Sequence, residues 1–121
     1  VSPMNEQTSE KGLAGERQAL AYLRQHGMRP VCQRYRCPYG EIDLVMLDGE
    51  CLVFVEVKLR SRGRKNDGVL AVNFQKQQRL IRAARCYLGE YPTEMPVRFD
   101  IVEITGAGVF HLPNAFEGSE W

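Results

Sequence analysis

The chain has 121 residues, of which 44% are hydrophobic and 26% charged, and its formal net charge is +1. These values are typical of one soluble globular domain, and the length excludes a chain that needs disulfides to hold its core together. No apolar run approaches the ~18 residues of a membrane span, and the first residues lack the pattern of a secretory signal. We therefore expect one cytoplasmic domain, residues 1–121, without membrane contact and with flexible tails at residues 1–8 and 114–121.

Charge is unevenly distributed along the chain. Residues 58–85 contain nine basic residues and one acidic residue, whereas residues 86–121 contain one basic and six acidic residues. A basic segment of this kind is suited to contact phosphate, and a solvated helix face plus a loop is the alternative interpretation. The four cysteines form no C-x-x-C pair, so the sequence does not support a zinc site, and free thiols are expected, as in a reducing cytosol.

The first predicted element is a helix from residue 9 or 10 to His26, which ends at Gly27. One face of this helix is apolar and contains Leu13, Ala19, Leu20 and Leu23. Glu16 falls in the middle of that face, where a carboxylate is unfavourable unless something compensates its charge. Two interpretations stay open: Glu16 reaches water at the rim of the face, or it points into a polar or metal-containing pocket.

Three strand patterns follow this helix. The first covers Arg29–Arg36, and after a loop at residues 37–40 the other two cover Glu41–Leu47 and Glu50–Lys58. Asp48-Gly49, between the last two strands, is a strong signal for a two-residue hairpin turn. This turn predicts that Leu47 lies opposite Glu50, Asp43 opposite Phe54, and Glu41 opposite Glu56.

Side chains alternate along the hairpin, which gathers polar groups on one face. That face holds Glu41, Asp43, Glu56 and Lys58, and the other face holds Ile42, Leu44, Val55 and Val57. A basic loop over residues 60–72, a helix over Asn73–Leu88, and strands over Val97–Thr105 and Val109–Leu112 follow. The tail is expected to dock through Phe116 or Trp121. This order of elements predicts an α/β, three-layer-like sandwich in which helices flank a mixed central sheet.

Three carboxylates and a lysine on one sheet face pack poorly, because like charges at short distance repel unless a cation joins them. A divalent ion with oxygen ligands, Mg²⁺ or Mn²⁺, would resolve this repulsion and keep coordination sites for water and phosphate. The backbone carbonyl of Val57 would add a ligand, and Lys58 would contact a scissile phosphate or help to deprotonate the attacking water. A salt-bridged, half-exposed sheet face is the alternative interpretation.

Two segments of the hairpin, Gly40-Glu41-Ile42-Asp43-Leu44 and Phe54-Val55-Glu56-Val57-Lys58, resemble the YraN-like family of bacterial proteins. They are also similar to the PD-(D/E)xK nuclease superfamily, which has the restriction-endonuclease-like fold, and especially to its Holliday-junction-resolvase-like branch. Further matches are Gly15-Glu16, Lys76 and Arg98-Phe99-Asp100, so the resemblance extends over about residues 12–104.

The resemblance implies a catalytic set of four residues: Glu16, Asp43, Glu56 and Lys58. Asp43 and Glu56 would be the metal ligands, and Glu41 is a rival of Asp43 for this role. Lys58 would be the catalytic lysine. Glu16 would correspond to the helix carboxylate that resolvase-like members aim at the metal.

Basic residues after the hairpin are expected to hold the backbone of a nucleic acid. They are Arg60, Arg62, Arg64, Lys65, Lys76 and Arg79. Arg98 and Asp100 are instead expected to form a structural ion pair.

These features favour a metal-dependent endonuclease that hydrolyses DNA, with branched DNA in repair or recombination as the expected substrate. Two other classes of function stay open. One is a catalytically silent nucleic-acid-binding module of the same fold, and the other is an interaction protein that uses its tail or a free sheet edge. Symmetric cutting of a four-way junction would require a homodimer.

Overall fold

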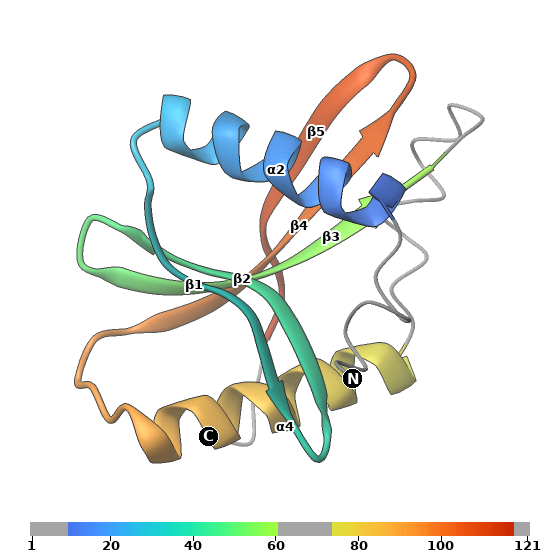
Figure 1. Ribbon diagram of the computed structural model, residues 1–121. Helices are drawn as coiled ribbons and strands as arrows, with labels where there is room; N and C mark the ends of the chain where they lie inside the picture. Colours follow the sequence, from blue (N-terminus) through green and yellow to red (C-terminus); the bar gives the residue numbers. More distant parts are fainter. Residues whose placement is uncertain (1–9, 61–73, 118–121) are drawn as a thin grey trace.

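The computed structural model describes residues 10–60 and 74–117 of the chain. These residues form two helices and five strands, which Figure 1 shows along the chain. The elements are α2 (Glu10–Gln25), β1 (Arg29–Cys37), β2 (Gly40–Asp48), β3 (Cys51–Leu59), α4 (Phe74–Glu90), β4 (Val97–Thr105) and β5 (Gly108–Phe116). Within these ranges, no helix is both long enough and apolar enough to cross a membrane.

The five strands form one mixed sheet in the order β1-β2-β3-β4-β5. Neighbouring strands are antiparallel except β3 and β4, which run parallel. Parallel neighbours need a crossover connection, and α4 lies within it. The two helices lie on opposite faces of the sheet (Figure 1). The predicted α/β sandwich with a mixed central sheet is therefore confirmed, and it is compatible with the restriction-endonuclease-like fold.

Each helix covers an apolar core of its own. Under α2 the core contains Ala19, Leu23, Leu44, Met46, Val53, Val55, Val102 and Ile104. Under α4 it contains Ile42, Val45, Phe54, Leu80, Ala84, Tyr87 and Phe99. Successive residues of a strand point to opposite faces, so the continuous apolar runs of β2, β3 and β4 supply both cores. The four cysteines are free and half-buried, as expected.

The β2–β3 hairpin turns one position later than predicted. Asp48 pairs with Cys51, and the turn consists of Gly49, with a φ of 62°, and Glu50. The predicted Asp48-Gly49 turn is therefore wrong, because the glycine with positive φ takes the first of the two turn positions. The pairing shifts by two residues, so the next partner of Asp43 along the ladder is Glu56 rather than Phe54. A shift of two keeps Asp43 and Glu56 on a common face.

The backbone of β2 changes face at Asp43, which the alternation did not predict. Ile42 belongs to the core under α4 and Leu44 to the core under α2, although both were expected on one face. In β1, Arg34 lies between the partners of Ile42 and Leu44 and has a left-handed φ of 50°. Such a residue interrupts the regular pleat. The left-handed residue of β1 thus lies opposite the position in β2 at which the alternation fails.

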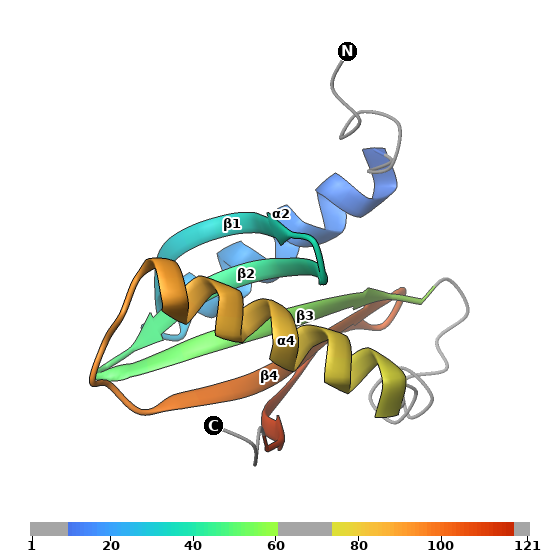
Figure 2. The same ribbon diagram turned by 90° about the horizontal axis from the view of Figure 1, so that it is seen from below.

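Strands β2 and β3 part at the same place. Their recorded pairs run from Asp48–Cys51 to Leu44–Val55. Beyond Leu44, the β1–β2 hairpin curves away from β3, as Figure 2 shows from below. The resulting fork carries Asp43 on one arm and Glu56 on the other.

Strand β5 extends further than predicted. Residues 114–116, which were expected to begin a flexible tail, belong to β5. The ring of Phe116 stacks on Phe99 with centroids 5.0 Å apart, which confirms the predicted docking through Phe116. The prediction of a flexible tail was wrong for residues 114–116, because the Phe116 ring packs on Phe99 of another strand and a local sequence pattern does not reveal such a contact. The rest of the predicted tails, residues 1–8 and 118–121, lies outside the described residues.

Candidate functional site

A cavity of about 240 Å³ lies at the fork, beside the first turns of α4. The described residues that line it are Gly40, Glu41, Asp43, Glu56, Lys76, Arg79 and Leu80. They come from β2, β3 and α4, three elements that are separate in the sequence. Two of the four predicted catalytic residues, Asp43 and Glu56, thus face one hollow. The other two reach this region through contacts with their neighbours.

Asp43 is half-buried and bridges the fork. The backbone N–H of Val57 donates a hydrogen bond to Asp43 Oδ2 over 2.7 Å. Burial raises the pKa of Asp43 well above its usual range, and the nearby Glu56 carboxylate raises it further. The Val57 hydrogen bond lowers the pKa but does not outweigh these two effects. Asp43 is therefore a carboxylate whose negative charge is poorly compensated.

Glu56 is contacted by two lysines. Lys58 Nζ lies 3.2 Å from Glu56 Oε2, and Lys76 Nζ lies 3.7 Å from the same oxygen. Lys58 follows Glu56 on β3, whereas Lys76 arrives from the first turn of α4. Burial lowers the pKa of Lys76, and so does the neighbouring Lys58. The structure thus brings Lys76, which was expected to hold nucleic acid, directly to the predicted catalytic residues.

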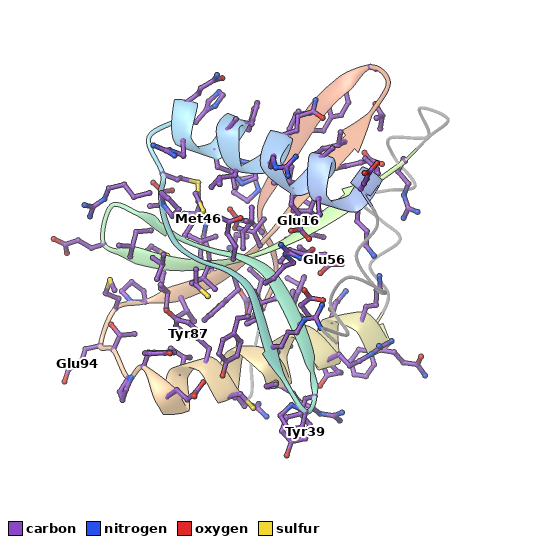
Figure 3. The ribbon with its side chains drawn as sticks, in the orientation of Figure 1. Glu16, Tyr39, Met46, Glu56, Tyr87 and Glu94 are labelled. Carbon is purple, nitrogen blue, oxygen red and sulfur yellow. The ribbon has the colours of Figure 1, made fainter. Side chains whose placement is uncertain are left out.

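Glu16 reaches the same region from α2, on the other side of the sheet. Its Oε1 lies 3.3 Å from Arg34 Nε, and Figure 3 shows Glu16 near Glu56. Burial raises the pKa of Glu16, Arg34 lowers it, and Glu41 and Glu56 raise it again. The misfit of Glu16 on its helix is therefore compensated by an arginine. Local sequence patterns could not predict the contact, because it joins a residue of α2 to a residue of β1.

Glu41, the rival of Asp43, has a different environment. Its Oε2 lies 3.6 Å from Arg36 Nε, and both side chains are one-third exposed. Glu41 lines the cavity but has a cation of its own, whereas Asp43 lies next in register to Glu56 across the fork. This geometry favours Asp43 over Glu41 as the partner of Glu56.

Three of the predicted nucleic-acid-binding residues are described by the structure. Lys76 and Arg79 line the cavity, and Arg60 follows β3, where its N–H bonds the carbonyl of Ile104 over 2.8 Å. The other predicted members of this set, Arg62, Arg64 and Lys65, lie outside the described residues. The two predicted nucleic-acid-binding residues that line the cavity, Lys76 and Arg79, thus both come from helix α4.

Glu103 is a buried carboxylate that the sequence analysis did not select. It is fully buried in β4 and is the register partner of Lys58 in the parallel β3–β4 ladder. Its neighbours Val102 and Ile104 point toward α2, so Glu103 points to the α4 side, the side on which Phe54 of β3 lies. The sequence feature that could have identified Glu103 is its position as a single charged residue within the otherwise apolar segment 101–104.

Another buried carboxylate, Asp100, lies in β4 away from the fork. This fully buried carboxylate accepts hydrogen bonds from Arg98 Nε (2.9 Å), Arg98 Nη2 (3.1 Å) and the Asn114 N–H (2.9 Å). His111 Nε2 lies 2.7 Å from its Oδ2. Burial alone would raise the pKa of Asp100, but these partners outweigh it and lower the pKa. The predicted structural ion pair of Arg98 and Asp100 is confirmed.

The cavity residues fit a divalent ion by their chemistry. The described part of the chain contains no group of three or more His, Cys, Asp and Glu side chains arranged to hold a metal. Asp43 and Glu56 supply two carboxylates, which is the usual protein share of a Mg²⁺ site completed by water and phosphate. A divalent cation would also relieve the repulsion that raises the pKa of Asp43. Val57 gives its N–H to Asp43, and its predicted carbonyl ligand stays a prediction.

Comparison with known proteins places these residues in a family. The model of the family described as "Uncharacterised protein family UPF0102" matches residues 15–104. A UPF0102 protein of Janthinobacterium sp. (strain Marseille) is 44% identical over 106 residues, which cover 88% of this chain and 86% of that protein. A UPF0102 protein of Legionella pneumophila (strain Philadelphia 1) is 40% identical over 114 residues, covering 91% and 97%. One of Nitrosospira multiformis is 46% identical over 110 residues, covering 88% and 92%. The chain therefore belongs to the UPF0102 family, the YraN-like family that its hairpin resembles.

Proposed function

We propose that this protein is a metal-dependent endonuclease that hydrolyses phosphodiester bonds in DNA. The observation that carries the proposal is the pair of facing carboxylates, Asp43 and Glu56, at the rim of a hollow that also holds Lys76. Poorly compensated carboxylates next to basic side chains are typical of sites that bind a cation and an anion together. The similarity of the hairpin to the PD-(D/E)xK superfamily supports the same chemistry.

The proposed roles follow from the positions of the residues. Asp43 and Glu56 would hold Mg²⁺ or Mn²⁺, which when bound lowers the pKa of a water and stabilises negative charge on a phosphate. The Val57 N–H fixes the orientation of Asp43. Lys58, 3.2 Å from Glu56, is placed to hold the scissile phosphate or to orient the attacking water. Glu16 is held by its ion pair with Arg34, and its charge acts on the two carboxylates that would hold the metal, Asp43 and Glu56.

The expected substrate is branched DNA in repair or recombination. Lys76 and Arg79 lie beside the carboxylates, and the wider basic segment, residues 58–85, would follow the phosphate backbone. A single small domain meets only part of a four-way junction, so symmetric cutting would use a homodimer with one site on each protomer. A protein that acts on DNA in repair or recombination is expected to be cytoplasmic.

One observation favours a second candidate, nucleic-acid binding without cleavage. Glu56 Oε2 is contacted by both Lys58 and Lys76, which compete with a metal for this carboxylate. A module of this kind would bind DNA through its basic residues and leave it intact.

A cleavage and binding series separates the two candidates. Four-way junction, flap, single-stranded and blunt duplex DNA are incubated with Mg²⁺, Mn²⁺ or EDTA, and native gels report binding. The variants are Glu56→Gln and Lys58→Ala, with Glu50→Gln, an exposed carboxylate in the turn at the far end of the same hairpin, as matched control.

The nuclease proposal expects metal-dependent cleavage that Glu56→Gln and Lys58→Ala abolish and Glu50→Gln retains. Cleavage by Lys58→Ala at the wild-type rate would remove the proposed role of Lys58. Salt-sensitive binding without cleavage in either metal would favour the binding module. Absence of both binding and cleavage would point to a protein partner.

A further inference from the structure

The β1–β2 turn presents a rigid aromatic side chain beside the carboxylate cavity. Cys37 pairs with Gly40, so Pro38 and Tyr39 alone form the turn. Proline fixes its own φ and limits the freedom of the turn. The side chain of Tyr39 is 54% exposed. An exposed aromatic ring on a short, proline-containing turn is held ready for a ligand at small cost in conformational entropy.

Helix α4 lies against this turn. A Cβ placed on Gly40 would lie 3.9 Å from both the Cβ and the carbonyl oxygen of Arg79, which is ordinary van der Waals contact. Gly40 has a φ of 151°, a conformation that residues with a side chain rarely adopt. The backbone conformation of Gly40 therefore favours glycine at this position, and the turn places Tyr39 and Arg79 around the same hollow.

A second hollow of about 560 Å³ lies around Tyr39. Its lining residues are Arg36, Cys37, Pro38, Tyr39, Gly40, Glu41 and Arg79. This volume falls within the range of small-molecule sites, ~300–1,000 Å³. Two guanidinium groups and one carboxylate give the lining a net positive charge. The ion pair of Arg36 with Glu41, at 3.6 Å and one-third exposed, is weak enough for a phosphate to displace.

The two hollows share three lining residues: Gly40, Glu41 and Arg79. A chain of nucleotides can therefore pass from Asp43 and Glu56 to Tyr39 without leaving the surface. A paired base in a duplex is stacked on both sides and offers its edges only. An unpaired base has a free face that stacks on an aromatic ring.

We propose that Tyr39, with Arg36 and Arg79, forms a site for an unpaired nucleotide of DNA next to the carboxylate cavity. The inference rests on the proposed function for the location of the scissile bond, and it specifies the substrate: DNA with a single-stranded segment beside that bond, such as a flap. Tyr39 stacks on the base, and the two arginines bind the flanking phosphates.

The test measures binding in EDTA, so that it does not depend on cleavage. The probes are a short single strand and a flap that carry 2-aminopurine in the unpaired segment, and a blunt duplex of the same sequence. Stacking on an aromatic ring quenches the fluorescence of 2-aminopurine. The variants are Tyr39→Ala and Tyr39→Trp. Tyr91→Ala is the matched control, because Tyr91 is 56% exposed and lies just beyond the far end of α4.

We expect Tyr39→Ala to weaken binding of the single strand and the flap about tenfold, to abolish the quenching, and to leave the duplex unchanged. Tyr39→Trp retains binding and quenching, and Tyr91→Ala behaves as wild type. Equal binding by wild type and Tyr39→Ala, an equal loss for duplex and flap, or no binding of the single strand by wild type would each overturn the proposal. Tyr39-dependent binding of single-stranded RNA at least about tenfold tighter than DNA would also overturn it.

The same variants distinguish failure of this inference from failure of the proposed function. Tyr39-dependent binding of unpaired DNA without metal-dependent cleavage would retain the nucleotide site and reject the nuclease. If cleavage depends on metal, and Tyr39→Ala cleaves the flap as fast as wild type does and the duplex as fast as wild type does, the nuclease is retained and the nucleotide site is rejected.

Discussion

Two aspartates of the sheet, Asp43 and Asp100, show how neighbours decide the state of a carboxylate. Asp100 is fully buried, yet its pKa is lowered, because Arg98, His111 and the Asn114 N–H surround it. Asp43 is only half-buried, yet its pKa is raised well above its usual range. The difference lies in the partners: within residues 10–60 and 74–117, Asp43 accepts a hydrogen bond from the Val57 N–H, while the charges of Glu56, Glu16 and Glu41 raise its pKa.

Asp100 is held by partners that stabilise its charge, whereas the neighbours of Asp43 destabilise its charge. Every contact of Asp100 favours its ionised form, so Asp100 links β4 to β5 and needs no ligand. Asp43 sits in an arrangement that costs free energy in the absence of a cation. Unfavourable arrangements of this kind cluster at functional sites, which is why Asp43 is the candidate of the two for binding a cation.

Asp43→Asn is expected to have the largest effect: it lowers the cleavage rate and raises the free energy of unfolding. If Asp43 holds the metal, this change lowers single-turnover cleavage about 10³-fold, which is about 4 kcal/mol. In EDTA at neutral pH it raises the free energy of unfolding by about 1 kcal/mol, because it removes a poorly compensated charge. Cleavage assays and urea denaturation measure the two quantities. A lower free energy of unfolding would show that Asp43 is structural, as Asp100 is.

Asp100→Ala should have the reverse profile. It leaves Arg98 and His111 without their buried partner and lowers the free energy of unfolding by about 3 kcal/mol. Asp48→Ala is the matched control, because Asp48 contacts the same Arg98 at 2.9 Å but has a 43% exposed side chain. An exposed ion pair is worth less than about 1 kcal/mol, so this control should lose little. Similar losses in the two variants would contradict the structural role of Asp100.

The two aspartates should also respond to pH in opposite directions. The lowered folded-state pKa of Asp100 adds stability above its unfolded pKa, and this stability is lost as the pH falls through the folded pKa. The raised folded-state pKa of Asp43 removes stability above that pKa, and this loss disappears as the pH falls toward the unfolded value.

Urea denaturation as a function of pH measures this difference. The advantage of Asp43→Asn over wild type, about 1 kcal/mol at neutral pH, should shrink on acidification toward about pH 4. The deficit of Asp100→Ala should persist there and shrink only at lower pH. An advantage of Asp43→Asn that does not vary with pH would mean that its origin is packing rather than charge.

The smallest expected effect concerns Glu41→Gln. Glu41 has Arg36 as its partner and is one-third exposed, so its loss should change cleavage less than about tenfold. Asp43→Asn and Glu41→Gln are compared in the same single-turnover assay. A larger effect for Glu41→Gln would reverse the assignment of the two carboxylates.

Local rules predicted most elements of the fold. Apolar periodicity located both helices, and alternation located the strands that carry Asp43, Glu56 and Lys58. The error in the turn at Gly49 shifted the pairing by two residues, and because side chains alternate with period two, it did not separate Asp43 from Glu56. The ion pair of Arg98 and Asp100 was predictable because the two residues lie on the same strand.

Local patterns in the chain were therefore enough to predict the sandwich, the carboxylates Asp43 and Glu56, and the nearby Lys58. How the charges of these residues are compensated depends on contacts between elements that are distant in the chain. Arg34 of β1 contacts Glu16 of α2, and Lys76 of α4 contacts Glu56 of β3. Glu103 of β4 is the register partner of Lys58 in the parallel β3–β4 ladder. Each of these relations joins residues far apart in the chain. Their strength depends on distance and burial, which no local pattern in the sequence specifies.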